Sequence, residues 1–187
     1  IAGDGVSILT QAHGADFEEA VDRGNVYAVA NQVGVTSQAG LSATTPVLTL
    51  YNPAGSGIKA ILWYAGAIFT VAFATAGAIF VATNTDVSAA AVTGTLATAH
   101  RNLKLSDRKP ALTPMLAATL PAAPVAIALL GVGLTGAITT VPFLSPTGRW
   151  FNGAIIIMPG TNLSIQTGVA SGASGMFCEY IWEEAPL

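Results

Sequence analysis

Hydrophobic and polar residues alternate along most of residues 46–187, and a period of two predicts β-strands. The last run is the clearest, because Cys178, Tyr180 and Trp182 share one face whereas Glu179 lies on the other. The runs are short and are separated by clusters of glycine, proline and asparagine, which mark turns. Several short strands joined by such turns predict an all-β fold, a β-sandwich or jelly roll, with Tyr180 and Trp182 facing its core.

The longest uncharged stretch, residues 60–85, has the length and apolar character of a transmembrane helix. Large and small residues nevertheless alternate along it, β-branched and aromatic residues are abundant, and residues 75–77 favour a turn. No cluster of lysine or arginine flanks the stretch to fix an orientation in a membrane. The pattern therefore predicts two strands, and we expect no membrane partner.

Both faces of the strand expected over residues 60–71 are apolar. Strict alternation places Leu62 and Tyr64 on one face and Trp63 and Phe69 on the other. A two-layer sandwich buries only one face of each strand, so the second face needs another cover. A partner subunit is the simplest cover, because exposed apolar patches usually mark interfaces.

Residues 1–45 differ from the rest of the chain and hold five of its ten acidic residues. A short helix is predicted, with Asp16 as its N-cap and Gly24 as its end. Residues 33–45 are small and polar, which leaves two interpretations open: an ordinary surface helix with a linker, or an extended arm that reaches a neighbouring subunit. The chain is therefore divided into an N-terminal arm with a short helix, residues 1–45, and a β-sandwich domain, residues 46–187, that is expected to fold without the arm.

Charged residues are scarce, since they make up 9% of the 187 residues, against roughly a quarter in ordinary soluble domains. Hydrophobic residues make up 52%, which excludes a disordered chain. A surface this poor in charge is expected to be covered by other protein. Four of the seven basic residues lie in one short stretch that Asp107 interrupts: Arg101, Lys104, Arg108 and Lys109. With a net charge of −3, so small a patch does not predict a nucleic-acid partner.

No set of residues predicts catalysis. Residues 131–136 match the G-x-G-x-x-G pattern of dinucleotide-binding folds, but the β-branched residues and proline that follow do not form a helix. His13 and His100 lie apart in polar segments, and the glutamates near the C-terminus suit a solvated strand edge better than an acid–base pair. Cys178 alternates with apolar neighbours and is expected to be buried. We therefore expect no enzyme, no catalytic, cofactor-binding or metal-binding residues, and no cofactor.

Three segments together resemble a group of virion structural proteins of tailed bacteriophages. The resemblance spans most of the chain but is anchored only in these segments, which read RGNVY with ANQ (residues 23–32), LYNPAGSG (residues 50–57), and MPG with LSI and YIWEE (residues 158–184). In that group a basic residue usually follows the last glycine of the second motif directly, whereas here Ile58 precedes Lys59. The motifs look like turns and strand ends, so the resemblance implies a location in the virion and no active site.

The resemblance does not distinguish capsid from tail, which leaves two hypotheses for the function within the virion. One is a capsid-decorating or cement protein, which stabilises the shell by self-association and contacts the major capsid protein or other virion proteins. The alternative is a receptor-binding or fibre-like module on head or tail, which presents loops such as 84–100 or 168–175 to a ligand. Low charge predicts a homo-oligomer, and the resemblance favours a trimer, because three copies suit the local three-fold positions of an icosahedral shell and the axis of most phage fibres.

Overall fold

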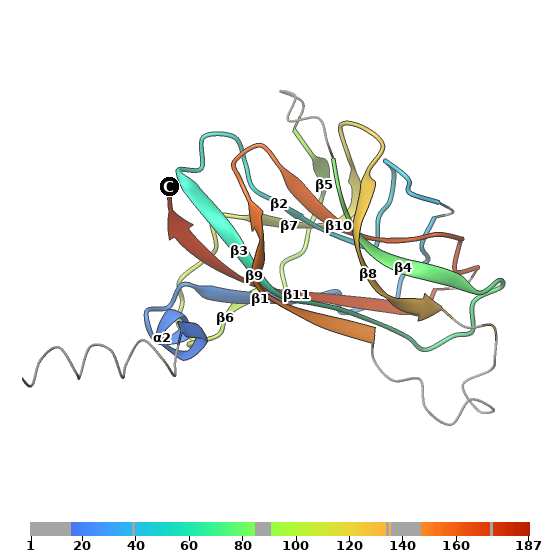
Figure 1. The fold of residues 1–187 in the computed structure, drawn as a ribbon, viewed down its shortest axis with the longest axis horizontal. Coiled ribbons are helices and arrows are strands. Elements are labelled where there is room, and N and C mark those ends of the chain that lie inside the picture. Colours follow the sequence, from blue (N-terminus) through green and yellow to red (C-terminus); the bar gives the residue numbers. More distant parts are fainter. Residues whose placement is uncertain (1–15, 39, 85–90, 134, 136–146, 173) are drawn as a thin grey trace, which may run out of the picture.

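The computed structural model of the chain describes residues 16–38, 40–84, 91–133, 135, 147–172 and 174–187. Two antiparallel sheets pack face to face and a short helix, α2 (Asp16–Asp22), lies at one end of the molecule (Figure 1). Sheet A contains, in spatial order, β6 (Arg101–Asn102), β1 (Val26–Ala30), β11 (Met176–Pro186), β3 (Ile58–Phe69) and β9 (Thr147–Ile157). Sheet B contains β5 (Thr93–Leu96), β7 (Thr113–Thr119), β2 (Leu48–Tyr51), β10 (Asn162–Thr167), β4 (Gly77–Thr83) and β8 (Val125–Gly133). The predicted all-β sandwich is confirmed.

The connectivity is that of a jelly roll. Without β5, β6 and β7, which form an insertion between β4 and β8, eight strands remain. Sheet A then holds the first, eighth, third and sixth of them side by side, and sheet B holds the second, seventh, fourth and fifth. This is the strand order of an eight-stranded jelly roll.

The core between the sheets is built from the inward faces of the central strands. In β11 the even-numbered residues point inward, so that Cys178, Tyr180 and Trp182 are buried as the alternation predicts. The ring of Trp182 stacks on that of Tyr27 in β1, with the ring centroids 5.8 Å apart. Figure 1 shows β1 and β11 side by side although they come from opposite ends of the chain.

Part of the segment expected to be an arm, residues 1–45, pairs with strands of the sandwich. Residues 26–30 form β1, which pairs with β11 on one side and with β6 on the other, and Tyr27 is fully buried. Residues 43–45 also bind the sandwich, since the Thr45 amide donates to Ala118 and the Ala43 carbonyl accepts from Leu120. Residues 43–45 are small and polar, so their composition resembles that of a linker. Their hydrogen bonds to the sandwich are made by backbone groups, which composition does not reveal. The short helix is confirmed, and Gly24 follows its end with a φ of +72°.

The facing predicted for β3 is correct only up to a β-bulge. Leu62 pairs with Trp182 and Tyr64 pairs with Ile181, so Trp63 is the extra residue between them. The bulge shifts the alternation by one residue, and Phe69 therefore points into the core on the same side as Leu62. Trp63 and Tyr64 consequently share the outer face of sheet A.

The uncharged stretch 60–85 forms two strands in its described part, as predicted. β3 lies in sheet A and β4 lies in sheet B, and residues 70–76 connect them. Among the described residues, no helix is long and apolar enough to cross a membrane.

Candidate interaction surface

The glycine-rich motif at residues 131–136 falls partly outside the described residues, since residues 134 and 136 are not described. Gly131 and Gly133 lie in β8, where they pair with Ile79 and Gly77 of β4. Both glycines therefore belong to an antiparallel ladder. A side chain on Gly133 would overlap the buried ring of Phe73, so close packing explains the glycine there.

Of the two histidines, only His100 lies within the described residues. His13 lies outside the described residues, and the Nδ1 atom of His100 lies 2.9 Å from the Ala97 carbonyl oxygen. No group of three or more histidine, cysteine, aspartate or glutamate side chains with the geometry of a metal site occurs within the described ranges. Cys178 is buried as predicted, and burial raises the pKa of its thiol well above the usual value.

The glutamates near the C-terminus do not lie on a strand edge, because β11 is the central strand of sheet A. Glu184 is buried, and its carboxylate accepts hydrogen bonds from the backbone amides of Ala111 and Leu112 at 2.9 Å and from Trp182 Nε1 at 3.3 Å. It therefore fixes the segment before β7 to the core. The sequence did not predict this role of Glu184. The only cue in the sequence is that Glu184 occupies an even-numbered, inward-facing position of the alternating strand β11.

One side of the sandwich is lined by large apolar side chains that are exposed to solvent. Each is between 45% and 61% exposed, and they lie in β8 and at the end of β9: Val125, Ile127, Leu129, Val132, Ile156 and Met158. We call this set the apolar flank. Ile127 and Ile156 line one hollow, so the two strands form a continuous surface there.

The apolar flank lies where both sheets end. β8 is the edge strand of sheet B and β9 is the edge strand of sheet A, and the two strands are in contact. An edge strand has unpaired backbone groups, and natural proteins usually protect it with charge, proline or short length. β8 has nine residues and contains no charged residue and no proline. Its exposed face is therefore suited to cover by another chain.

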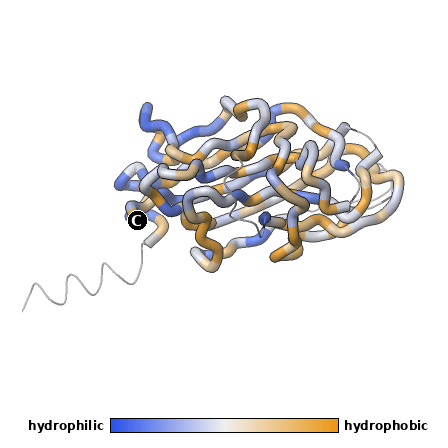
Figure 2. Tube along the Cα trace, turned by 90° about the horizontal axis from the view of Figure 1, so that it is seen from above, coloured by the Kyte–Doolittle hydropathy of each residue, from blue (hydrophilic) through white to orange (hydrophobic). Residues whose placement is uncertain are grey.

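A group of charged residues lies around α2 and the basic stretch 101–109. Lys104 of the basic stretch pairs with Asp22 of α2 at 3.1 Å, and Arg108 donates to the Asn25 side chain at 2.6 Å. Figure 2 shows many of the strongly hydrophilic segments toward the end at which the C-terminus lies. The molecule thus has one charged end and one apolar flank.

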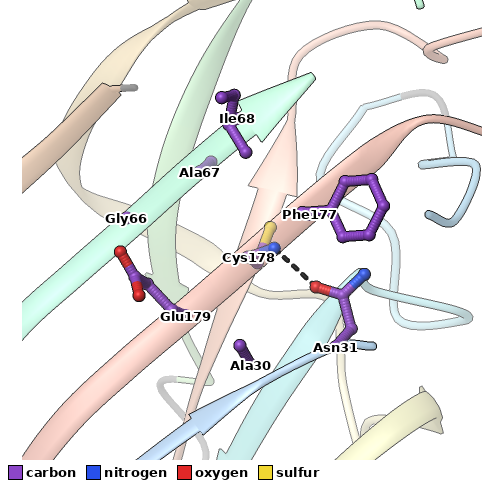
Figure 3. Close-up of a pocket in the computed structure, with 8 residues that line it drawn as sticks. All are labelled: Ala30, Asn31, Gly66, Ala67, Ile68, Phe177, Cys178 and Glu179. Atoms are coloured by element: carbon purple, nitrogen blue, oxygen red, sulfur yellow. Dashed lines mark hydrogen bonds between the residues drawn. The ribbon is translucent and has the colours of Figure 1, made fainter. Parts of the chain in front are cut away.

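A second surface feature lies on the outer face of sheet A. The small residues Ala30 and Gly66 leave a shallow hollow of about 180 Å³ beside Ile68, Phe177 and Glu179 (Figure 3). At its border the Tyr64 hydroxyl lies beside the Glu179 carboxylate. Burial first, and the negative charge of Glu179 second, raise the pKa of Tyr64.

Comparison of the chain with protein-family models, with curated proteins and with solved structures returns no match. The function is therefore inferred from the geometry of the two surfaces and from the sequence.

Proposed function

We propose that this protein is a non-enzymatic structural component of a tailed-bacteriophage virion, and specifically a capsid-decorating or cement protein that stabilises the shell by self-association. The observation that carries self-association is the apolar flank, whose exposed side chains lie on two adjoining edge strands. The virion location rests on the sequence resemblance.

The flank has the composition of a subunit interface. Interface cores are depleted in charge and rich in large apolar residues, and obligate interfaces are the most hydrophobic. The sequence has no charged residue between Lys109 and Arg149, a stretch that includes the whole of β8. The pairing of β8 with β4 contains two register shifts. The exposed side chains of β8 are nevertheless all apolar.

A second copy of the chain is the best occupant of the flank. Another copy presents the same six uncharged flank residues, so association through them buries no unpaired charge, which would be costly. Soluble homo-oligomers usually close with point-group symmetry. The choice of a trimer is supported by the phage resemblance alone, whereas association itself is supported by the flank.

Replacing Leu129 by lysine tests the interface. Leu129 is 61% exposed on the flank, so the substitution adds charge to the interface without disturbing the core. Analytical ultracentrifugation at micromolar concentration should show an oligomer for the parent and a species near 18.9 kDa for Leu129→Lys.

The matched control is Leu105→Lys, which makes the same change at a residue that is 84% exposed and lies outside the flank. This variant should keep the oligomer. A parent protein that is a stable monomer would refute self-association. Loss of the oligomer in both variants would mean that the experiment does not locate the subunit interface at the flank.

Copy number separates decoration from the alternative, a receptor-binding or fibre-like module. Quantitative mass spectrometry of purified particles should find hundreds of copies of a decoration protein, as expected for a subunit repeated over a shell. About a dozen copies would instead favour a tail or fibre role. Absence from purified particles would contradict the virion location.

A further inference from the structure

A row of four aromatic rings crosses the outer face of sheet A. Phe17 of α2 packs edge-on against Trp63 and Trp150, at centroid distances of 5.1 and 5.9 Å, and Trp150 in turn contacts Tyr64 at 5.1 Å. The β-bulge places Trp63 and Tyr64 on the same face. Each ring contacts at least one other ring of the row, so the neighbours restrict its orientation.

Trp150 is the accessible member of this row, since it is 54% exposed although two other rings support it. Tryptophan combines a large apolar face with a polar N–H group, and it is enriched where proteins make contacts. A tryptophan supported on two sides and open to solvent can stack on a flat apolar ligand surface.

Glycines shape the surface next to Trp150. A side chain at Gly66 or at Gly148 would overlap the ring or hydroxyl of Tyr64, so these glycines let Tyr64 lie along the sheet. Beyond Tyr64 the hollow of about 180 Å³ continues the surface toward Ala30 and Phe177. This volume is below the roughly 300–1,000 Å³ of pockets for drug-sized ligands, and it suits one unit of an extended chain.

Two carboxylates lie beside the aromatic row, both on β11. Glu183 accepts a hydrogen bond from Trp63 Nε1 at 3.3 Å, and Glu179 lies beside the Tyr64 hydroxyl. A carboxylate has about four acceptor sites, so one hydrogen bond leaves capacity for a ligand's hydroxyl groups. Their negative charge disfavours an anionic ligand.

We infer that the outer face of sheet A binds a neutral saccharide chain, with Trp150 stacked on the C–H face of one sugar ring and Glu179 and Glu183 accepting hydrogen bonds from sugar hydroxyls. A pyranose ring offers this combination of a flat apolar face and a rim of hydroxyl donors. A quaternary ammonium ion needs a cage with space between the rings. Here the rings contact each other, so the row forms a platform. The inference is independent of self-association through β8.

The test uses the chain of residues 1–187 and follows its tryptophan fluorescence during titration with cellohexaose, mannohexaose, xylohexaose and chitohexaose. At least one oligosaccharide should bind, and Trp150→Ala should weaken its binding about tenfold, as expected for loss of one aromatic contact. Trp150→Tyr, which keeps a stacking ring, should restore most of the affinity. Glu179→Gln should weaken binding less than Trp150→Ala, and Leu105→Ala should have no effect.

Ultracentrifugation of the same variants separates this inference from the proposed function. Trp150→Ala should keep the parent's oligomeric state, and Leu129→Lys should keep saccharide binding. The inference is overturned if no oligosaccharide of the panel binds at millimolar concentration, or if Trp150→Ala dissociates the oligomer, which would make the face a subunit contact. Binding of choline chloride that Trp150→Ala abolishes, without saccharide binding, would also overturn it.

Discussion

At the scale of single residues, Trp182 of β11 packs against β1, a strand that is far from it in the sequence. Its ring is fully buried, stacks on Tyr27 of β1, and donates to the Glu184 carboxylate at 3.3 Å. Removal of this side chain would leave a large cavity and would take away one of the hydrogen bonds that the buried Glu184 carboxylate accepts. Each of these losses destabilises a folded protein.

We predict that Trp182→Ala lowers the free energy of unfolding by about 3–5 kcal/mol, the usual cost of truncating a large core aromatic residue. Urea denaturation followed by circular dichroism measures this change. Trp150→Ala is the matched control, because it removes the same side chain from an exposed position and should cost much less. Equal unfolding midpoints for Trp182→Ala and the parent would show that the ring does not support the core.

The sequence predicts the facing of Trp182 but not the burial of Glu184. Alternation is a local property, so it reports which residues of β11 share a face. An acidic residue at the end of that run looks solvated, because buried carboxylates are rare. Burial becomes favourable only through the amides of Ala111 and Leu112, which lie more than 70 residues away in the chain. Their approach depends on the tertiary fold.

At the scale of elements, the sequence did not predict strand β1. It lies between β6 and β11 in sheet A, and Val26, Tyr27 and Val29 are buried. Its five residues stand between a helix and a polar segment, so the alternating pattern is too short to be distinguished from a linker. The sequence also did not predict the β-bulge at Trp63. The bulge shifts the register of β3 by one residue, and this shift arises from pairing with β11, so the alternating pattern of β3 does not reveal it.

We predict that a chain lacking residues 1–40 does not fold cooperatively. The deletion removes β1, exposes the edge of β11, and leaves Trp182 without the ring of Tyr27. Thermal unfolding monitored by near-ultraviolet circular dichroism should show no sharp transition. A chain lacking only residues 1–15 keeps every described strand and should melt cooperatively. A sharp transition after the longer deletion would mean that β1 is dispensable.

At the scale of the whole molecule, the sequence predicted the class of fold, but not where the large exposed apolar surface lies. The expectation that both faces of residues 60–71 need cover drew attention to β3. In the structure β3 is an inner strand of its sheet, and α2 covers part of its outer face through Phe17 and Trp63. The large exposed apolar surface lies instead on β8 and β9, whose positions at adjoining edges depend on the order of strands. That order is set by long-range pairing.

The proposed oligomer makes a prediction about stability. If the native state is an oligomer and the unfolded state is a monomer, mass action stabilises the folded protein as concentration rises. For a trimer of a chain this long, the midpoint of thermal unfolding should rise by about 2–4 °C for each tenfold increase in protein concentration. Calorimetry over a hundredfold range of concentration would resolve the shift.

The Leu129→Lys variant should lose this dependence, because its unfolding no longer includes dissociation, whereas Leu105→Lys should behave like the parent. Comparing the two variants shows whether contacts at the apolar flank contribute to the free energy of unfolding. Ultracentrifugation alone reports only the oligomeric state. If the melting midpoint of the parent is independent of concentration while it sediments as an oligomer, association contributes little to the stability of the fold. The flank would then be a contact between subunits that are already stable, and the predicted dependence of the unfolding midpoint on concentration would be wrong.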